Sequence, residues 1–591
     1  MCFWRVWSGA TVSLFLLLGE DLAADLNPHP ISRFVTSRSH LPTTALALGE
    51  SQSAVLRGPD VHRYGVELSA GQFASVHLSQ TGGNVVAALF DPDGQLIDLV
   101  DRNGAGFVET IDVFAKKTGT YVVQTAIFEW TTPAAAYAIS LIRREKAGAS
   151  AEAIADQLLS SWYDRSRPGA AVAVIKGGRV VFQRTIGLAD VEQGIAITAD
   201  TRFDLASVAK QFTAYAVAML IDRGLIGLDD DVRRYVPELP QFAKPITIRH
   251  LLDHTSGLRD WDAAFGLMGV KIEDGVTKAQ IIEWVSRQKE LNFVPGSAQE
   301  YSNTGYNVLA EIVTRVTRQP FEAWVRQNVF EPAGMSAIAN GDAHGSVPAK
   351  ANSYMRVLPP LRLWSGNSTA AAGSSSIHAS LNDLVAWVRN GESGKVGNDR
   401  VLAMVGKPGQ LDDGTKIDYG FGRWFRERKG LRYVGHLGLC AGYRISLRRF
   451  PERDLTFIYM TNDGNDGSYL RGEAIENLFL NIPPEAVQVP DGEFTPPEAA
   501  PKPTHVSDYE GVYYSDELHT SYEVRGDGRG LAAYHAINGA IPLILAESDT
   551  FRSEQWFMPR VAFIRDNRNG IAGFRVSTES ARNMLFRRVS K

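Results

Sequence analysis

The spacing of apolar residues changes twice along the chain, and this change constrains the fold more than any other feature. From about Ser51 to Arg144, and again from about Val506 to Lys591, apolar residues alternate in short runs separated by turn sequences such as Asp-Gly, Gly-Gly and Asn-Gly. Such alternation is typical of small antiparallel β domains. Between these regions, long apolar helical patterns are mixed with strands. A chain of 591 residues is also too long for one hydrophobic core, so we expect two to four domains.

The middle region predicts one sheet that is assembled from distant parts of the sequence. Gly169 to Gly187 reads as a hairpin with Gly177-Gly178 at its turn, and Arg432 to Thr461 reads as three consecutive strands. A helical cluster between them would pack beside the sheet, which gives an α+β domain. We therefore expect a multidomain protein with these parts: a signal peptide at 1–24, an all-β sandwich accessory domain at 44–146, the α+β domain at 151–485, a linker at 486–504 and a small all-β barrel at 505–591.

The first residues resemble an export signal. They carry one positive charge at Arg5, an apolar centre from about Val6 to Gly19 and small residues at Ala23-Ala24. The apolar centre is shorter than the roughly 20 residues of a membrane-spanning helix. We expect a secreted or periplasmic protein that has no stable membrane insertion once the signal is removed. After that removal only Cys440 remains, so no internal disulfide can form.

Composition and charge exclude several classes of function. The formal net charge is −5, and no basic run with interleaved aromatic residues is present, so we expect no nucleic-acid partner. His344, His378 and His535 are isolated from Cys, Asp and Glu at ligand spacing, so we expect no metal and no cofactor. The sequence does not indicate an oligomeric state.

Ser207 and Lys210 stand three residues apart at the start of a strongly apolar helical segment. At this spacing both side chains lie on one helix face, so the amine can reach the hydroxyl. The partial positive charge of a helix N-terminus favours a developing alkoxide, and a buried lysine can act as a base when burial lowers its pKa. Ser286 and Lys289 repeat the spacing, but they lie in a helix whose polar residues look solvated, so we choose the first pair.

Tyr301 and Asn303 follow a Pro-Gly turn and precede another apolar helix. A neighbouring ammonium would lower the pKa of the Tyr301 phenol, so that tyrosinate could accept the serine proton and return it to a leaving group. The Asn303 amide could orient Lys210 and donate to a substrate amide oxygen. His254, at the end of a helix, is expected to bond nearby backbone rather than to act in catalysis.

A third segment, His436-Leu437-Gly438, lies in a predicted strand. At a sheet edge, His followed by Gly lets a substrate backbone pair closely with the strand, and the amide of Leu439 would then point inward as an oxyanion donor. A purely structural role for His436 stays open.

In this order, Ser207-x-x-Lys210, Tyr301-x-Asn303 and His436-x-Gly438 resemble the three motifs of the serine penicillin-recognising enzymes. The surrounding sequence is most similar to the class C β-lactamase, D-aminopeptidase and esterase branch of that family, in the segments 246–258, 295–313, 371–388 and 419–424. The resemblance implies an antiparallel sheet flanked by helices plus a helical lobe, with the active site between them. It also implies an acyl-enzyme on Ser207, proton transfer by Lys210 and Tyr301, substrate positioning by Asn303, and an oxyanion site formed by the amides of Ser207 and Leu439.

One departure from the family pattern concerns Leu437. Members that act on penicillin usually carry a hydroxyl residue at this place, where it helps to bind the substrate carboxylate. The sequence therefore favours an exported serine hydrolase that acts on a small-molecule or short-peptide substrate, either a D-amino-acid peptide or a carboxylic ester. The alternatives are a β-lactamase or DD-peptidase that acts on β-lactams or cell-wall peptides, and a non-catalytic receptor for cell-wall fragments.

Overall fold

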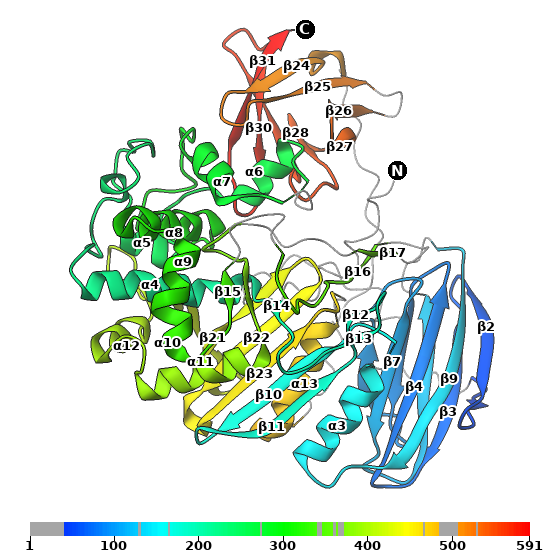
Figure 1. Ribbon diagram of the computed structural model, residues 1–591. Coiled ribbons are helices and arrows are strands. Elements are labelled where there is room, and N and C mark those ends of the chain that lie inside the picture. The colour runs from blue at the N-terminus through cyan, green and yellow to red at the C-terminus, as the bar shows by residue number, and fades with distance from the viewer. Residues whose placement is uncertain are drawn as a thin grey trace.

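The computed structural model describes residues 41–590, except 128–131, 164–165, 272–274, 340–345, 358–361, 365–370, 465–466, 484–505 and 527–529. The predicted signal peptide at 1–24, the predicted linker at 486–504 and His344 lie outside the described residues. Figure 1 shows a strand-rich N-terminal part, a mixed central part and a C-terminal barrel, with the barrel and the N-terminal part at opposite ends of the molecule. The predicted fold class is confirmed.

The N-terminal part is a sandwich of two sheets. Alternating buried positions of both sheets form one apolar core between them, as the alternation in sequence predicts. In spatial order, the first sheet contains β1 (Thr44–Ala45), β3 (Val61–Leu68), β8 (Gly119–Ile127), β5 (Val85–Phe90) and β6 (Leu96–Val100). The second contains β2 (Ser51–Arg57), β9 (Ala134–Lys146), β4 (Gln72–Thr81) and β7 (Val108–Phe114).

The sandwich is fastened to the first helix of the central part, α3 (Ala151–Trp162). The partly buried carboxylate of Asp112 accepts hydrogen bonds from Ser161 Oγ and from Trp162 Nε1, each at 2.7 Å. Phe73 of β4 lies in the same apolar cluster as the buried residues of α3. The junction thus combines apolar packing with a partly buried carboxylate whose hydrogen bonds are satisfied.

The central part is built on a seven-stranded antiparallel sheet whose strands come from both ends of this region. The predicted hairpin is present, with Gly177 and Gly178 at φ of 56° and 70° in its turn, and so are the three predicted consecutive strands. In spatial order, the sheet contains β11 (Arg179–Ile186), β10 (Ala170–Lys176), β23 (Leu455–Thr461), β22 (Tyr443–Phe450), β21 (Leu431–Cys440), β20 (Arg423–Arg428) and β19 (Tyr419–Gly420).

Alternate residues of the inner strand β10 serve two different cores. Ala170, Val172 and Val174 pack with α3 and α13 (Ser468–Leu480) on one face of the sheet. Ala171, Ala173 and Ile175 belong to the large core of the helical lobe on the other face. Because both faces are covered, the strand is apolar at nearly every position.

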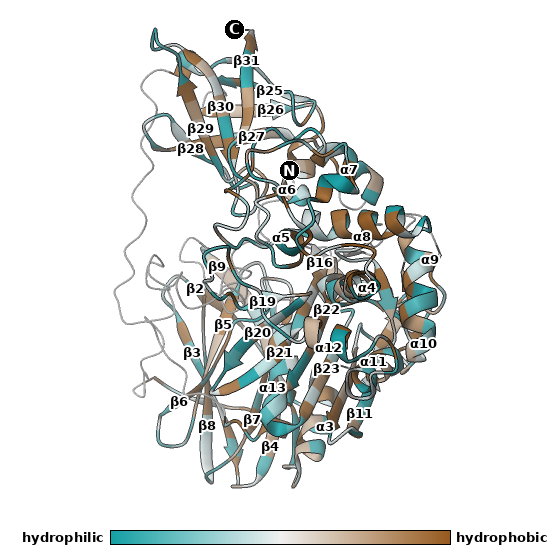
Figure 2. Cartoon of the chain, turned by 90° about the vertical axis from the view of Figure 1, so that its left-hand side faces the viewer, coloured by the Kyte–Doolittle hydropathy of each residue, from teal (hydrophilic) through white to brown (hydrophobic). Residues whose placement is uncertain are grey.

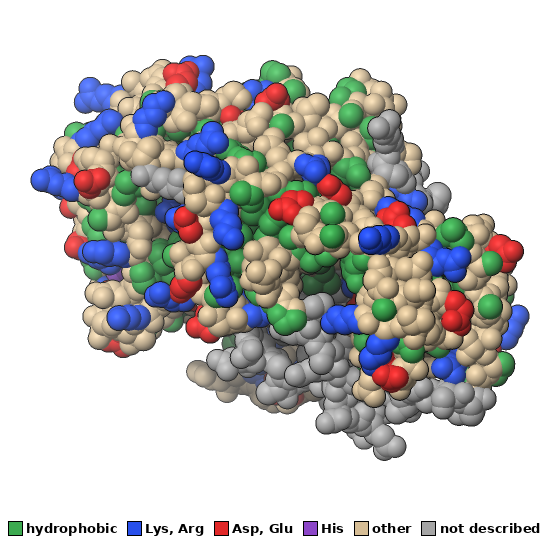
Figure 3. All heavy atoms as spheres, turned by 90° about the horizontal axis from the view of Figure 1, so that it is seen from below, with side chains coloured by type: hydrophobic (Ala, Val, Ile, Leu, Met, Phe, Trp, Pro, Cys, Tyr) green, Lys and Arg blue, Asp and Glu red, His purple; other side chains and the backbone are tan. Residues whose placement is uncertain are grey.

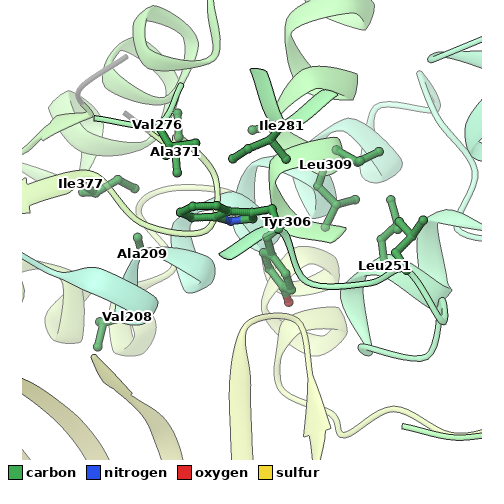
Figure 4. Close-up of a cluster of buried hydrophobic side chains, with 14 of the residues drawn as sticks. Val208, Ala209, Leu251, Val276, Ile281, Tyr306, Leu309, Ala371 and Ile377 are labelled. Atoms are coloured by element: carbon green, nitrogen blue, oxygen red, sulfur yellow. The ribbon is translucent and has the colours of Figure 1, made fainter. Parts of the chain in front are cut away.

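The helical lobe covers the second face. Figure 4 shows part of its core, where Val208 and Ala209 lie in the same cluster as Tyr306, Leu309 and Ile377, and α8 carries hydrophobic stretches in Figure 2. Its helices, with α11 beside the sheet, are α4 (Lys210–Asp222), α5 (Ile248–Leu252), α6 (Trp261–Leu267), α7 (Lys278–Val285), α8 (Asn303–Thr317), α9 (Phe321–Val325), α10 (Glu331–Ala333), α11 (Leu381–Ser393) and α12 (Asp399–Val405). The short strands of the central part are β12 (Leu188–Asp190), β13 (Ile195–Ala196), β14 (Phe203–Asp204), β15 (Ile338–Ala339), β16 (Met355–Val357), β17 (Arg362–Trp364) and β18 (Ile377–Ala379).

The C-terminal part closes into an eight-stranded antiparallel barrel, as predicted, and leaves no open sheet edge. The expected Asn-Gly turn joins its sixth and seventh strands, with Asn569 at φ 64°. The strands are β24 (Gly511–Ser515), β25 (Thr520–Gly526), β26 (Leu531–His535), β27 (Gly539–Glu547), β28 (Thr550–Arg552), β29 (Arg560–Arg565), β30 (Ile571–Ser577) and β31 (Met584–Ser590).

The barrel docks on the helical lobe at α6 and α7, which lie directly beside it in Figure 1. Tyr522 donates a hydrogen bond to the carbonyl of Leu267, and Asn538 donates to the carbonyl of Gly266. An added Cβ at Gly266 would meet Phe557 at 2.7 Å, so glycine permits this close approach.

The charged side chains visible in Figure 3 are interspersed, with Lys and Arg next to Asp and Glu over the face shown. No helix within the described ranges combines the length and apolar character that a membrane crossing requires.

Candidate active site

Ser207 lies in a single 3-10 turn, η2 (Ala206–Ala209), that leads directly into α4. Ala206 adopts a left-handed conformation at φ 47°, which costs a non-glycine residue about 1 kcal/mol. Its N–H donates to the buried Asp204 carboxylate at 2.8 Å, and this bond supports the turn. Such local strain is typical of functional sites, and the turn places Ser207 at the positive end of α4.

The Lys210 side chain is completely buried, and its Nζ atom has three acceptors. It donates to Ser207 Oγ at 3.2 Å, to Asn303 Oδ1 at 2.7 Å and to the carbonyl of Ser374 at 3.0 Å. Burial lowers the pKa of Lys210 to about 7, and the nearby Asp260, Cys440 and Asp262 oppose this shift. Both the amine and the ammonium are therefore available near neutral pH.

The Tyr301 ring lies against Lys210, with Nζ at 4.8 Å from the ring centroid. The expectation that the ammonium lowers the pKa of Tyr301 is wrong. Burial raises this pKa, the neighbouring Asp260 adds to the effect, and the Ser207 hydroxyl opposes it only in part. The phenol is neutral in the resting site because transfer out of water disfavours tyrosinate more than the neighbouring amine can favour it.

Asn303 begins α8 and connects Lys210 to a buried carboxylate. Its Oδ1 accepts from Lys210, while its Nδ2 donates to Asp260 Oδ2 at 2.9 Å. The predicted orientation of Lys210 by Asn303 thus has a structural basis. The sequence carried no signal for Asp260, because its contact with Asn303 joins segments 43 residues apart.

Gly438 and Leu439 lie in the part of β21 that extends beyond its neighbour β20. The pairing of β20 with β21 ends at Gly435, so among the described strands residues 436–440 pair only with β22. The strand has the predicted free edge here, and the Leu439 side chain is 52% exposed. An added Cβ at Gly438 would lie 2.3 Å from the carbonyl oxygen of Leu205, so only glycine lets β21 approach the Ser207 turn.

His436 is buried beside Lys210 and is neutral, since burial lowers its pKa to about 3 and the Lys210 charge adds to that effect. Its Nδ1 donates to the carbonyl of Leu437, and its Nε2 accepts from the Tyr419 hydroxyl at 3.3 Å. Its ring lies 6.0 Å from that of Tyr301, between centroids. In this arrangement the neutral His436 side chain lines the site.

His254 bonds nearby backbone, as expected: its Nδ1 accepts from the N–H of Ser302 at 3.1 Å. The centroid of its ring lies 4.3 Å from that of the Tyr301 ring, so His254 packs against the tyrosine. Ser286 donates to the carbonyl of Glu283, and Lys289 pairs with Asp516 at 3.9 Å on the surface. This second Ser-x-x-Lys pair therefore has no part in the site.

The structure brings four predicted residues together around Lys210, which contacts Ser207, Tyr301 and Asn303, and it places the predicted strand against the Ser207 turn. Sequence reasoning missed Asp204, Asp260 and the carbonyl of Ser374. The described residues contain no group of three or more His, Cys, Asp or Glu side chains that could hold a metal ion. The arrangement is suited to acyl transfer, with a hydroxyl nucleophile next to a base of near-neutral pKa.

Comparisons with known proteins agree with this chemistry. The family described as Beta-lactamase matches residues 144–479, which is more than half of the chain. A D-aminopeptidase of Brucella anthropi is 30% identical over 378 residues, 62% of this chain and 68% of that protein. A D-aminopeptidase of Brucella ovis is 29% identical over 337 residues, 54% of this chain and 60% of its own length.

A penicillin-binding protein of Bacillus subtilis is 27% identical over 344 residues, 54% of this chain and 74% of that protein. Among solved structures, an octameric penicillin-binding protein homologue from Pyrococcus abyssi has a TM-score of 0.48 at 22% identity and covers 74% of this chain and 99% of its own. The D-amino acid amidase from Ochrobactrum anthropi SV3 has a TM-score of 0.47 at 23% identity and covers 56% of this chain and 97% of its own. By the match over residues 144–479, the chain belongs to the β-lactamase family of serine hydrolases.

Proposed function

We propose that the chain hydrolyses amides of D-amino acids, or short peptides that begin with one, through an acyl-enzyme on Ser207. The observation that carries the proposal is the 3.2 Å contact between Ser207 Oγ and the buried amine of Lys210, whose pKa is about 7. The D-aminopeptidase relatives supply the substrate class.

In the first step the neutral amine of Lys210 accepts the proton of the Ser207 hydroxyl, and Oγ bonds to the substrate carbonyl carbon. The negative charge moves to the carbonyl oxygen, where the amides of Ser207 and Leu439 are the proposed donors. The free edge of β21 beside the Ser207 turn supports this placement.

In the second step the carbon–nitrogen bond of the amide breaks, and the leaving amine takes a proton from the Tyr301 hydroxyl, which recovers one from Lys210. Tyr301 therefore transfers protons as a neutral phenol rather than acting as a standing tyrosinate, in keeping with its raised pKa. Water then attacks the acyl group by the same route in reverse, and releases the acid and Ser207.

Leu437 supports a second candidate, the hydrolysis of carboxylic esters. This residue provides no hydroxyl next to His436 for a substrate carboxylate, so an uncharged acyl compound is a reasonable substrate. The same feature argues against β-lactams and peptides that end in D-Ala-D-Ala.

A fluorophosphonate probe followed by peptide mass mapping tests the nucleophile. We expect label on Ser207 in the wild-type chain, none after Ser207→Ala, and unchanged labelling after Ser286→Ala, the matched control with the same local spacing. A folded protein that takes no label from any acylating or phosphonylating probe would instead favour a non-catalytic receptor.

A substrate panel separates the candidates. D-Amino-acid p-nitroanilides should be cleaved faster than their L-enantiomers and faster than p-nitrophenyl esters of comparable reactivity, with nitrocefin slowest. Preference for the esters without selection between enantiomers would replace the peptidase proposal by the esterase.

We also propose that the chain is exported, on the sequence of residues 1–24 alone.

A further inference from the structure

The Asn303 side chain has only one orientation that satisfies its neighbours. Its Oδ1 accepts from Lys210 Nζ at 2.7 Å, and its Nδ2 donates to Asp260 Oδ2 at 2.9 Å. A flipped amide would set its N–H groups against the lysine donor and its oxygen against the carboxylate. Since the backbone N–H of Asn303 also donates to Asp260 Oδ2, at 3.1 Å, one carboxylate oxygen fixes both the helix start and the side chain.

The Asp260 carboxylate is itself fixed by burial and by hydrogen bonds. It is 3% exposed, and its Oδ1 accepts from the N–H of Trp261 at 2.8 Å, at the start of α6. Burial and the neighbouring Asp262 carboxylate raise the pKa of Asp260, and the Asn303 and Trp261 N–H groups and the Lys210 charge oppose that shift. Every hydrogen bond that its carboxylate makes here is accepted, which fits the ionised form.

The C-terminal barrel contributes the next contacts, through the connection between β30 and β31 (residues 578–583). The backbone N–H of Asp260 donates to the carbonyl of Ser580 at 2.9 Å. Arg582 pairs with Glu300, the residue before Tyr301. Asn292 of the central part bonds to the same connection of the barrel. Its Nδ2 donates to the Ser580 carbonyl at 3.0 Å, and its Oδ1 accepts from the N–H of Arg582 at 2.8 Å.

Arg259, next to Asp260, anchors the same segment to the barrel. Its side chain is almost fully buried, and it donates to Glu517 Oε2 at 2.6 Å and to the carbonyl of Arg582 at 2.8 Å. A buried charged group keeps such a partner because the loss of either one leaves an uncompensated charge. Residues 259–260 are therefore bonded to the barrel on one side and to the start of α8 on the other.

We propose that Asp260 is a positioning residue for the Lys210–Asn303 pair, and that the β30–β31 connection of the barrel holds Asp260 in place. Through the Asn303 amide, Asp260 sets where the Lys210 amine points, and through its charge it favours the ammonium. The inference rests on the proposed function of Ser207 and Lys210, and assigns the barrel a part in the geometry of their site.

The test is the pH profile of kcat/KM for Asp260→Asn in the full chain. The carboxylate favours the Lys210 ammonium, so its removal should move the acidic limb to lower pH. The plateau should fall by about 10-fold to 100-fold, because the Asn303 amide loses a charged partner. The ionisable groups that face Lys210 are Asp260, Asp262, Cys440, His254, His436, Tyr301 and Tyr306.

Two variants separate charge from position. Asp262→Asn removes a second, partly buried carboxylate near Lys210, whose hydrogen bond goes to the N–H of Ala263 rather than to Asn303. It should therefore move the limb to lower pH and keep the plateau within about 3-fold. Asp260→Glu keeps the charge but displaces it, so it should lower the plateau and leave the limb in place. Asp260→Glu also keeps the test decisive if Asp260→Asn fails to fold.

The contribution of the barrel is tested with Asn292→Ala, against Lys289→Ala as control. Both residues bridge lobe and barrel, but Lys289 pairs with Asp516 on the surface, away from Asp260. Asn292→Ala should lower kcat by about 3-fold to 10-fold without moving the limb, and Lys289→Ala should leave kcat unchanged. Equal effects of the two variants would overturn the barrel's part in the proposal.

Ser207→Ala and Asp260→Asn together test the nucleophile and the positioning residue separately. If Ser207→Ala abolishes turnover while Asp260→Asn keeps both the plateau and the limb of the wild type, Asp260 does not position the pair. If Ser207→Ala retains turnover, the nucleophile itself is wrong.

Discussion

Replacing Gly438 with alanine tests whether the contact between β21 and the Ser207 turn is needed for catalysis. An added Cβ would stand 2.3 Å from the carbonyl oxygen of Leu205 and 3.2 Å from Cβ of Ala206. Ordinary contact begins at 3.4 Å, so the strand and the turn must separate by about 1 Å. Neither side yields easily, because β21 pairs with β22 throughout this stretch and Ala206 is held by Asp204.

A displacement of this size matters because the proposed oxyanion donors come from both sides of the contact. Donors must lie within about 2.7–3.1 Å of the oxyanion, and misplacement by about 1 Å can cost on the order of 100-fold in rate. We therefore expect Gly438→Ala to lower kcat/KM by at least about 100-fold. Overpacking should also lower the free energy of unfolding by about 1–3 kcal/mol.

The assay pairs amide hydrolysis with thermal unfolding, and Gly391→Ala is the matched control. Gly391 lies in α11 with no atom within 4 Å of an added Cβ, so alanine should raise stability by about 0.5–1 kcal/mol and leave kcat/KM unchanged. If Gly438→Ala keeps wild-type kcat/KM in a folded protein, the reasoning about the close approach of strand and turn is refuted.

Three further predictions concern Tyr301, Lys210 and the proposed signal peptide. Tyr301→Phe should lower the acylation rate by about 100-fold or more in stopped-flow measurements, because the leaving group loses its proton donor, and wild-type rates would contradict that role. In the wild-type chain kcat/KM should rise as pH rises through about 7, where Lys210 loses its proton, and then level off; a profile that stays flat across neutral pH would show that another group is the base. If the proposed export signal is removed, N-terminal sequencing of the mature protein should begin near Asp25, and a chain that still begins at Met1 would contradict signal removal.

Much of the fold could be predicted from the sequence, because local patterns determine it. The turn at Gly177-Gly178 follows from glycine's tolerance of positive φ, and the alternating apolar residues on either side give the hairpin. The assembly of one sheet from distant strands followed from the same patterns at both ends of the central region. The family motifs also brought Ser207, Lys210, Tyr301 and Asn303 together correctly.

What the sequence could not provide depends on tertiary contacts. The pKa of Tyr301 was predicted in the wrong direction because burial, which no motif encodes, outweighs the neighbouring amine. Asp260 was missed because its partners, Asn303 and the carbonyl of Ser580, lie far away in the sequence. Neither contact leaves a periodic signal along the chain.

The junction at Asp112 has a consequence for the folding of the whole chain. Without the sandwich, Ser161 Oγ and Trp162 Nε1 would lose their acceptor, and the core of α3 would lose Phe73. Since α3 covers one face of the central sheet, a fragment cut at residue 150 would expose the apolar surface of α3 that the sandwich normally covers. This surface would promote aggregation. The change in sequence pattern near that residue marks the boundary between two domains, but the two domains do not unfold independently. We therefore expect the sandwich and the catalytic part to unfold in a single thermal transition.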